Sequence, residues 1–247
     1  MTTILSTNEL CKHFGGVLAT DNINVEFKDN QIKSIIGPNG AGKTTLINVI
    51  TGLLPASSGT VSYQGQDITN QPTHKLTKLG ISRTFQITSI FPGFTVFENV
   101  RIAKQVQRGG SLRIFSTKES LKEVNEETWA VLERLELQEM ALVPSKNLAH
   151  GDHRVLEVAI ALAGNPKILF LDEPTAGMSP AETEQIAKLI TGLTDNISVV
   201  LIEHDMDVVM AISNEITVLH QGTIIAEGPP QEIQKNEIVK EAYLGKE

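Results

Sequence analysis

The length, composition and charge of the chain exclude several classes of protein. Its 247 residues, 40% of them hydrophobic, suffice for one sizeable core with a smaller inserted lobe, and the formal net charge of -8 argues against a general electrostatic hold on nucleic acid or anionic lipid. No apolar run approaches the roughly 18 residues that span a bilayer, and the N-terminus lacks the pattern of a signal peptide, so we expect a cytoplasmic protein. The single cysteine, Cys11, cannot form an internal disulfide and is expected to be a small buried side chain.

Two strands are predicted near the start of the chain. Residues 4–10 are typical of a strand, and residues 23–27 alternate apolar and polar side chains, which is the period of a half-buried strand. The loop predicted between them contains Phe14, whose aromatic face could stack on a nucleotide base or could simply anchor the loop to the core. The residues alone leave these two roles open.

A phosphate-binding loop is predicted directly after the next strand. The sequence IGPNGAGKTT places glycines, Lys43 and Thr44 at the spacing of a P-loop, between an apolar strand over residues 32–36 and a helix that starts at about Lys43. The glycines let backbone N–H groups converge on phosphate, and the helix adds the positive end of its dipole, so an ordinary glycine-rich turn is the weaker alternative. Lys43 would bind the β- and γ-phosphates of a nucleotide, and the Thr44 hydroxyl would bind magnesium. The nucleotide is expected to contact Gly37, Pro38, Asn39, Gly40, Ala41, Gly42, Lys43, Thr44 and Thr45.

The segment after this helix contains short strands and a phenylalanine cluster. Residues 60–63 form an extended segment, and residues 81–85 are predicted as a strand that ends at Gln86. Three of the eight phenylalanines then fall within residues 91–97. Such a cluster is part of a core more often than not, and a partner-binding groove is the alternative.

The middle of the chain is predicted to be an inserted helical lobe. Residues 95–142 are highly charged and mainly helical in pattern, and the lobe is placed at approximately residues 87–163 within a single domain spanning residues 1–247. Its expected buried positions are Trp129, Leu132, Leu135 and Leu137. A helix that begins at Gly151 and Asp152 has the helical spacing of apolar residues that marks a buried face: Val155, Val158, Ala159, Leu162 and Ala163.

The last third of the chain alternates strands and helices. Residues 168–171 are all apolar, as in a parallel strand covered on both faces, and residues 198–202 form another such strand. Between them, residues 179–182 form a capping box with proline at the first helical position. A hairpin over residues 216–226 and a helix after residue 230 complete the prediction.

Polar residues that follow the predicted strands are expected to form one site. Parallel strands present their carboxyl ends at the same edge of a sheet, and the P-loop, Gln86, Asp172 with Glu173, and His204 each follow a strand end. Asp172 is suited to hold magnesium and Glu173 to polarise an attacking water. Gln86 can orient that water or bind the metal, and His204 can hydrogen-bond the γ-phosphate. Singly, each could instead be a solvated residue or a loop cap, but together with a P-loop they indicate nucleotide hydrolysis.

With these residues assembled, the chain resembles the nucleotide-binding subunit of ABC transporters along its whole length. GPNGAGKTT is similar to the Walker A motif, ILFLDEP to Walker B, RTFQ to the Q-loop, AGMSPAE to the D-loop and LIEHDM to the H-loop. The resemblance implies an α/β P-loop NTPase fold with a mainly parallel core sheet, an N-terminal antiparallel β portion and the inserted helical lobe, acting on ATP with Mg²⁺. The site residues that it implies are the catalytic Glu173, His204 and Gln86, the metal ligands Thr44, Gln86 and Asp172, and the base-stacking Phe14.

A narrower resemblance points to amino-acid import. The segments FGGVLATDNI, IEHDMDVVM, VLHQGTIIAEG and EAYLG are similar to the ATPases of high-affinity branched-chain amino acid importers, and urea-uptake ATPases are close relatives. The resemblance implies that two ATPase subunits enclose two ATP molecules head to tail and drive membrane permease subunits, which attach them to the cytoplasmic face of the membrane. It also implies a periplasmic or extracellular solute-binding protein as an indirect partner. The phenylalanine cluster then becomes the expected seat of a short permease helix.

The signature segment departs from the pattern of the family. Where LSGGQ is typical, this chain has LAHGD, so Ala149 replaces the serine whose hydroxyl contacts the opposing γ-phosphate. A hydrogen bond to a charged group contributes about 1.5–3 kcal/mol, so its loss weakens the closed dimer roughly ten- to a hundredfold at that site. Ala149 and Gly151 are still expected to contact the nucleotide held by the other subunit. We expect attenuation, and a heterodimer with a different ATPase is favoured over a homodimer.

Two other functions compete with solute import. A soluble ABC-type ATPase acting on DNA or ribosomes would resemble tandem domains or carry long coiled coils, and the acidic composition gives no support for nucleic acid. A regulatory module that binds ATP without turnover fits the altered signature, but the intact Glu173 and His204 argue against it. The solute itself is not readable from this chain, because the ATPase does not touch it.

Overall fold

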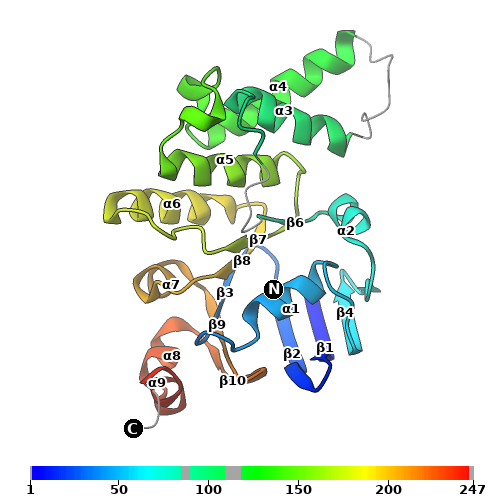
Figure 1. Cartoon of the computed structure of the whole chain (residues 1–247), viewed down its shortest axis with the longest axis vertical. Coiled ribbons are helices and arrows are strands. Elements are labelled where there is room, and N and C mark those ends of the chain that lie inside the picture. Colours follow the sequence, from blue (N-terminus) through cyan, green and yellow to red (C-terminus); the bar gives the residue numbers. More distant parts are fainter. Residues whose placement is uncertain (1, 85–89, 109–117, 245–247) are drawn as a thin grey trace.

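The computed structural model describes residues 2–84, 90–108 and 118–244, which form two β-sheets and their flanking helices (Figure 1). The larger sheet has the order β10-β9-β3-β8-β7-β6, and all neighbouring strands are parallel except β9 and β10. Its strands are β3 (Ile32–Ile36), β6 (Ile81–Arg83), β7 (Ile168–Asp172), β8 (Ser198–Ile202), β9 (Glu215–His220) and β10 (Thr223–Gly228). The smaller, antiparallel sheet has the order β2-β1-β4-β5, with β1 (Thr3–Phe14), β2 (Val17–Lys28), β4 (Ser58–Tyr63) and β5 (Gln66–Asp67). This arrangement confirms the predicted fold class.

The helices lie around the larger sheet and extend beyond it. Those of the described segments are α1 (Lys43–Ile50), α2 (Thr73–Leu79), α3 (Val96–Gln107), α4 (Lys118–Arg134), α5 (His150–Leu162), α6 (Pro180–Leu193), α7 (Met206–Ile212), α8 (Pro230–Lys235) and α9 (Glu237–Leu244). In Figure 1, α3 and α4 lie at one end of the long axis, with α8 and α9 near the other. Within residues 2–84, 90–108 and 118–244, no helix is both long and apolar enough to cross a membrane.

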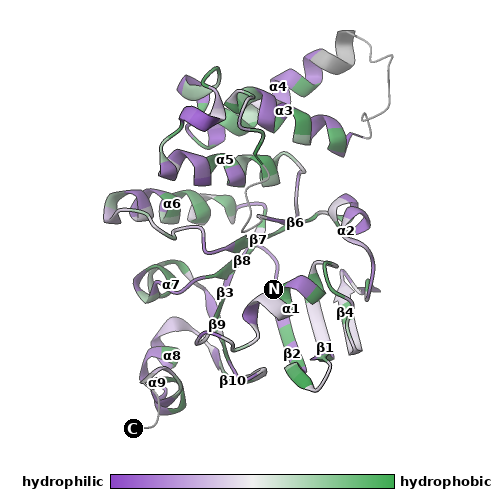
Figure 2. Cartoon of the chain, in the orientation of Figure 1, coloured by the Kyte–Doolittle hydropathy of each residue, from purple (hydrophilic) through white to green (hydrophobic). Residues whose placement is uncertain are grey.

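Both faces of the parallel sheet are buried, which explains its apolar strands. In β7, Leu169 and Leu171 pack in one cluster with residues of α5 and α6, whereas Ile168 and Phe170 pack in another with α1 and the antiparallel sheet. Alternate residues of one strand therefore face two different cores, and a polar residue would be buried on either side. The two helices have one inward face each, and Figure 2 shows both hydrophobic and hydrophilic residues on α5 and α6. The capping box predicted at the start of α6 is confirmed.

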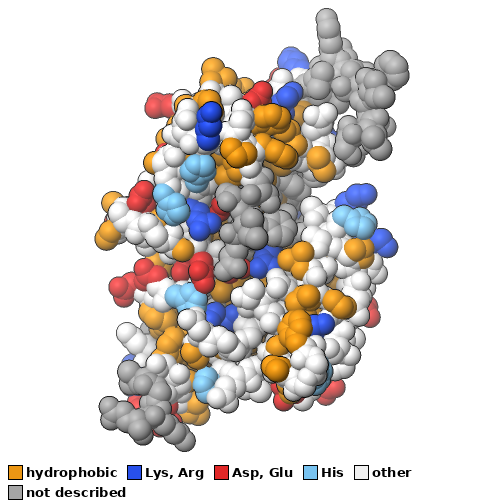
Figure 3. Space-filling model, in the orientation of Figure 1, with side chains coloured by type: hydrophobic (Ala, Val, Ile, Leu, Met, Phe, Trp, Pro, Cys, Tyr) orange, Lys and Arg blue, Asp and Glu red, His pale blue; other side chains and the backbone are white. Residues whose placement is uncertain are grey.

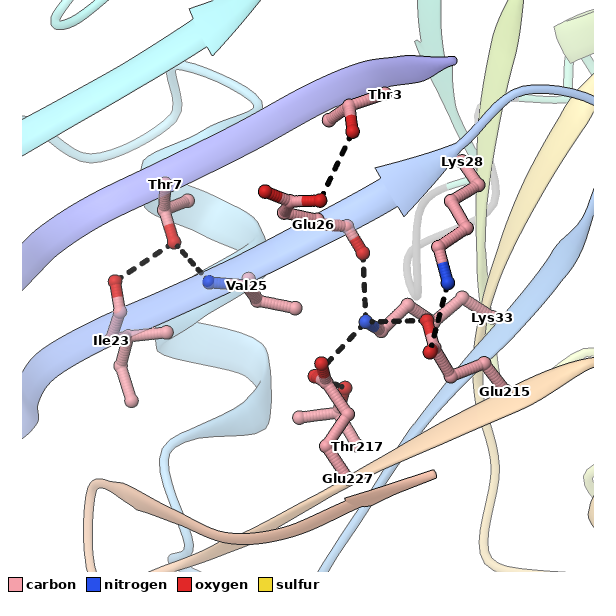
Figure 4. Close-up of polar contacts among 10 residues, drawn as sticks. All are labelled: Thr3, Thr7, Ile23, Val25, Glu26, Lys28, Lys33, Glu215, Thr217 and Glu227. Atoms are coloured by element: carbon pink, nitrogen blue, oxygen red, sulfur yellow. Dashed lines mark hydrogen bonds and ion pairs between the residues drawn. The ribbon is translucent and has the colours of Figure 1, made fainter. Parts of the chain in front are cut away.

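A buried lysine joins the two sheets (Figure 4). The side chain of Lys33 in β3 is 4% exposed, and its Nζ donates to the Glu26 carbonyl of β2 at 2.7 Å. The same ammonium contacts the carboxylates of Glu215 in β9 at 3.1 Å and Glu227 in β10 at 3.0 Å. A buried ammonium is tolerated only when such partners satisfy it. One side chain thus links strands from both sheets, and Lys33 is a structural residue.

The first strand is longer than predicted. Residues 11–14, predicted to be a loop, belong to β1, and the turn to β2 is confined to residues 15–16. The pairing of β1 with β2 shifts register at several points, and each irregularity breaks the two-residue alternation by which a strand is predicted. Cys11 is buried, as expected.

The predicted strand over residues 81–85 is too long. β6 ends at Arg83. The N–H of Thr84 still donates to the Phe170 carbonyl at 2.9 Å, but the Thr84 hydroxyl then accepts from the backbone N–H of Asp172 at 3.3 Å. Beyond Arg83, the hydroxyl of Thr84 therefore replaces a backbone carbonyl as the acceptor for β7. Residues 85 and 86 lie outside the described residues.

The predicted burial of Trp129 is wrong, although Leu132, Leu135 and Leu137 are buried. Trp129 is 38% exposed and packs against the Phe97 ring at a tilt of 42°, with centroids 5.2 Å apart. The inner position of α4 is occupied by Thr128, whose hydroxyl donates to the Val124 carbonyl at 2.7 Å. Because that bond satisfies the hydroxyl within the helix, threonine can take the buried position and the bulkier indole lies to one side.

Candidate nucleotide-binding site

Three parallel strands deliver polar segments to one edge of the larger sheet. Ile35 of β3 lies level with Ile202 of β8, and Ile202 lies level with Asp172 of β7. The P-loop follows β3, Glu173 follows β7, and residues 203–205 follow β8, so these segments leave the sheet side by side. On the face of the molecule seen in Figure 3, charged and histidine side chains lie between the levels of α5 and α7.

The P-loop is held in a tight ring that only glycine can form. Gly37 and Gly42 have φ of 149° and 100°, and a Cβ on them would lie 2.1 Å from the Leu219 carbonyl oxygen and 2.4 Å from the Ala19 carbonyl oxygen. The N–H of Gly222 donates to the Ala41 carbonyl at 3.0 Å. Strand β2, the end of β9 and the β9–β10 turn therefore pack against the loop from outside, and glycine at these positions lets the backbone approach them closely.

Lys43 lies inside this ring. It is 7% exposed, and its Nζ donates to the carbonyls of Gly37 at 2.6 Å and Pro38 at 3.1 Å. Burial lowers the pKa of Lys43 from its ordinary value, while the negative charges of Glu173 and Asp172 act in the opposite direction. The charges of Lys43, Asp172 and Glu173, which come from distant parts of the chain, therefore interact.

Asp172 is almost fully enclosed at the end of β7. Its side chain is 2% exposed, and Oδ2 accepts from Nη2 of Arg83 at 2.7 Å. The other nitrogen of that fork, Nη1, donates to Oδ1 of Asn48 on α1. Sequence reasoning missed Arg83 and Asn48. The available signal was the arginine inside the strand predicted over residues 81–85, because a charged side chain that is buried in a sheet requires a partner.

Glu173 and His204 form a pair across two strand ends. Oε1 of Glu173 lies 2.8 Å from Nε2 of His204, and the side chains are 31% and 44% exposed. Glu173 has a φ of 49°, and its N–H donates to the Ile202 carbonyl at 2.8 Å. A left-handed conformation is uncommon for a residue with a Cβ and is often found at functional sites. This backbone conformation places the Glu173 carboxylate beside the His204 imidazole.

A third carboxylate, that of Glu203, links the segment after β7 to the segment after β8. It is 3% exposed, and Oε1 accepts from the N–H and the hydroxyl of Thr175 at 3.0 and 2.6 Å. Oε2 accepts from the N–H of His204 at 2.9 Å and that of Asp205 at 3.4 Å. Because Glu203 bonds to both the segment after β7 and the segment after β8, it fixes Glu173 and His204 relative to each other. Sequence reasoning assigned it no role.

The remaining predicted site residues lie elsewhere. Phe14 is 46% exposed at the end of β1, with Nζ of Lys12 5.2 Å from its ring centroid. Ala149 and Gly151 lie at the start of α5, where His150 Nε2 is 3.1 Å from the Ala176 carbonyl oxygen. No hydrogen bond within the described ranges joins Ala149 or Gly151 to the P-loop. Gln86 lies outside the described residues.

The donor set suits a magnesium ion that is held mainly by a nucleotide. Oδ1 of Asp172 has no hydrogen-bond partner among the described residues, and Thr44 is exposed on the first turn of α1. No cluster of three or more His, Cys, Asp or Glu side chains that could hold a metal occurs in the described part of the chain. Magnesium on phosphates usually takes only one or two protein oxygens and completes its shell with phosphate and water. The residues present therefore fit this ion.

Comparison with protein families and curated proteins agrees with this geometry. A family model described as ABC transporter matches residues 20–176, and one described as branched-chain amino acid ATP-binding cassette transporter matches residues 223–247. The chain is 42% identical to the high-affinity branched-chain amino acid transport ATP-binding protein LivG of Escherichia coli, over 98% of each chain. It is 39% identical to the corresponding protein BraF of Pseudomonas aeruginosa, again over 98% of each.

Solved structures show the same fold. A nucleotide-free ATP-binding cassette from an ABC transporter superposes with a TM-score of 0.87 at 32% identity, covering 99% of this chain and 100% of the other. An ATP-binding cassette of an ABC transporter in its ADP conformation superposes with a TM-score of 0.88 at 33% identity, covering 100% of both chains.

Proposed function

Because the chain belongs to the ABC transporter family of ATP-binding proteins, we propose that it hydrolyses ATP to power an importer of branched-chain or other neutral amino acids. One observation carries the proposal. Lys43, Asp172, Glu173 and His204 share one sheet edge beside a P-loop, in a chain similar over 98% of its length to proteins named for branched-chain amino acid transport.

Residues 37–45 would bind the triphosphate. The carbonyls of Gly37 and Pro38 hold the Lys43 ammonium inside the loop. Phosphate oxygens are charged and make stronger acceptors than carbonyls, so they would draw the ammonium to the β- and γ-phosphates. The free N–H groups at the start of α1 add the helix dipole. Thr44, on the same turn, would reach magnesium.

Glu173 would act as the base for the attacking water. Its carboxylate is partly exposed, and Oε1 lies 2.8 Å from Nε2 of His204, so a water could reach the carboxylate while the contact with the imidazole fixes its direction. His204 would also hydrogen-bond the γ-phosphate and orient Glu173 when that phosphate is present. Magnesium, held by Thr44, Asp172 and Gln86, would neutralise charge on the phosphates.

Phe14 would support the nucleotide base. Its ring is 46% exposed, and Lys12 covers part of it with a cation 5.2 Å from the centroid. An exposed aromatic face that already attracts a cation is a suitable platform for a flat heterocycle, because stacking tolerates any purine. The hairpin that carries Phe14 continues into β2, which braces the P-loop at Ala19.

A groove beside the site offers a seat for a membrane permease. It has a volume of about 420 Å³ and is lined by residues of α3, α5, β6 and the phenylalanine segment. Phe91 and Phe94 are 51% and 44% exposed, with ring centroids 5.5 Å apart, and so do not belong to the core. The backbone beneath them is fixed by buried Asn99, which accepts from the Phe91 N–H at 2.8 Å. We propose that residues 87–163 form one lobe and that a short permease helix docks here at the cytoplasmic face.

Uptake by cells tests the whole proposal. Deleting the gene should lower uptake of radiolabelled leucine, isoleucine and valine, and the unchanged gene should restore it. A Glu173→Gln chain should not restore uptake, and a Phe91→Asp chain should hydrolyse ATP yet fail to restore uptake, because a charge in the groove opposes docking. Loss of urea uptake alone would move the chain to the urea importers. Unchanged uptake of all these solutes would reject the importer proposal.

The altered signature leads to a prediction about dimerisation. Ala149 is exposed, stands at the N-cap of α5 in an extended conformation, and makes no side-chain cap there. In a Glu173→Gln background, Ala149→Ser should strengthen ATP-dependent dimerisation about ten- to a hundredfold, because a hydrogen bond to charged phosphate contributes about 1.5–3 kcal/mol. Analytical ultracentrifugation with and without ATP measures this.

Serine is also a good helix N-cap and could stabilise the monomer. Thermal unfolding without ATP separates that effect, and Ala149→Gly serves as the control that adds no hydroxyl. Equal ATP-dependent dimerisation of the serine and alanine chains would contradict the role of this position. In the cell, the attenuated site favours pairing with a second, different ATPase subunit, and a solute-binding protein would act through the permease.

A further inference from the structure

Arg83 is a buried cation whose neighbours belong to the hydrolysis site. Its side chain is 7% exposed at the end of β6, the edge strand of the parallel sheet. Nη2 donates to Oδ2 of Asp172 at 2.7 Å, and Nη1 donates to Oδ1 of Asn48 on α1, the helix that begins at Lys43. The guanidinium therefore connects β6, the magnesium carboxylate on β7 and the P-loop helix.

Stability alone does not account for this arrangement. Removing two charges from water costs about as much as their attraction returns, so a buried ion pair is often no more stable than apolar residues of the same volume. Nε of Arg83 is buried without a hydrogen-bond partner among the described residues, so the guanidinium is not fully satisfied. The two bonds that it does make fix Asp172 and Asn48. The position of Arg83 therefore orients Asp172 and Asn48, although it leaves one nitrogen of the guanidinium without a partner in the described structure.

The bond to Arg83 also determines which oxygen of Asp172 is available. Oδ2 is occupied by the guanidinium, and Oδ1 has no partner among the described residues. Lys43 is another cation whose charge interacts with that of this carboxylate. Without Arg83, Asp172 would be free to rotate toward the Lys43 ammonium and would cease to present one defined oxygen.

We propose that Arg83 is a positioning residue for the hydrolysis reaction, which holds Asp172 in place so that one carboxylate oxygen faces the magnesium of the bound nucleotide. This inference rests on the proposed role of magnesium in the site. Residues that hydrogen-bond a metal ligand orient it, and their loss typically weakens metal binding about ten- to a hundredfold. Arginine suits the task because its planar fork can hold Asp172 and Asn48 at once, which a lysine cannot do.

The test measures metal binding and does not depend on turnover. In a Glu173→Gln background that retains ATP, the binding of Mn²⁺ as a probe for magnesium is titrated by electron paramagnetic resonance. Arg83→Gln should raise the half-saturating Mn²⁺ concentration about ten- to a hundredfold. Its affinity for ATP in the presence of a chelator should be unchanged, because Arg83 lies on the carboxylate and not in the P-loop. Arg83→Lys should show a smaller rise.

Two further variants keep the test decisive. Arg108, the C-cap residue of α3, contacts the carboxylates of Glu123 and Glu127 on α4. Arg108→Gln removes these contacts and should leave Mn²⁺ binding unchanged. Asn48→Ala removes the second anchor of the guanidinium and should raise the Mn²⁺ requirement modestly. If Arg83→Gln does not fold, Arg83→Lys and Asn48→Ala decide the question.

The outcomes separate this inference from the proposed function. If the parent chain binds ATP equally well with and without Mn²⁺, the proposed role of magnesium fails. If the parent requires Mn²⁺ and the Arg83 variants have the same requirement, only the positioning role fails. A lower Mn²⁺ requirement would show that Arg83 repels the metal, and it would also overturn the inference.

Discussion

Replacing Glu173 with glutamine is expected to abolish ATP turnover while the protein continues to bind ATP. The amide cannot accept a proton from water, and loss of a general base typically costs about 10²–10⁴-fold in rate. Glutamine has the same size as glutamate, and its amide can still contact His204. In the unchanged chain, Nε2 of His204 lies 2.8 Å from Oε1 of Glu173. Phosphate release measures turnover, and equilibrium binding of labelled ATP measures affinity.

The control for this prediction is a glutamate outside the site. Glu133 is exposed on α4, so Glu133→Gln should change neither turnover nor ATP binding. Equal turnover in the Glu173→Gln and unchanged chains would remove Glu173 from the role of base. A joint loss of turnover and ATP binding would instead show that glutamine disturbs the loop at this left-handed residue.

Lys43→Met should sharply weaken ATP binding and leave folding almost unchanged. The ammonium is the cation inside the P-loop ring, and each hydrogen bond from it to a phosphate oxygen contributes about 1.5–3 kcal/mol, so two such bonds correspond to a loss of roughly 10²–10⁴-fold in affinity. Burial already lowers the pKa of Lys43, so the charge is costly to hold and its removal relieves that cost in the folded chain. Equilibrium binding of labelled ATP and chemical unfolding measure the two effects.

Lys33 provides a matched control, since it is a second buried lysine on the same strand-loop-helix segment. Lys33 contacts Glu215 and Glu227 and supports the joint between the sheets (Figure 4). Lys33→Met should therefore lower the free energy of unfolding without a comparable loss of ATP affinity. Should that chain fail to fold, Lys28→Met, which removes only a partly exposed contact to Glu215, is the milder control. Unchanged ATP affinity in Lys43→Met would contradict the placement of phosphate in the P-loop.

Several elements were predictable from short stretches of sequence. The apolar runs of β7 and β8, the helix after the P-loop and the capping box of α6 depend on neighbours close in the chain, and they were predicted within about one residue. Residues 11–14 were predicted wrongly because the register shifts in their pairing with β2 break the two-residue alternation, and Trp129 because its burial depends on how α4 packs on other helices. Bulged pairing with β2 extends β1, and the packing of α4 against α3 and α5 buries Thr128 in place of the larger indole.

The candidate site was also predictable only in part. The proximity of Asp172, Glu173 and His204 was predictable because they lie at or just beyond the ends of β7 and β8, and parallel strands end at a common edge. Arg83, Asn48 and Glu203 were not assigned, since their roles arise from contacts across 28 to 89 residues of chain. Sequence patterns report local periodicity and give no direct sign of such long-range hydrogen bonds.

By itself, the sequence determined the apolar strands β7 and β8, the helix after the glycine-rich loop, the capping box of α6 and the family resemblance. These follow from residue type and spacing, which act through local backbone preference and the period of burial. Only the tertiary structure decided which oxygen of Asp172 is engaged, that Glu173 meets His204, and that Glu203 joins the two loops beneath them. The reason is physical. A buried charge is stable only beside partners that the fold brings close, and the chain order does not specify those partners until the sheet has formed.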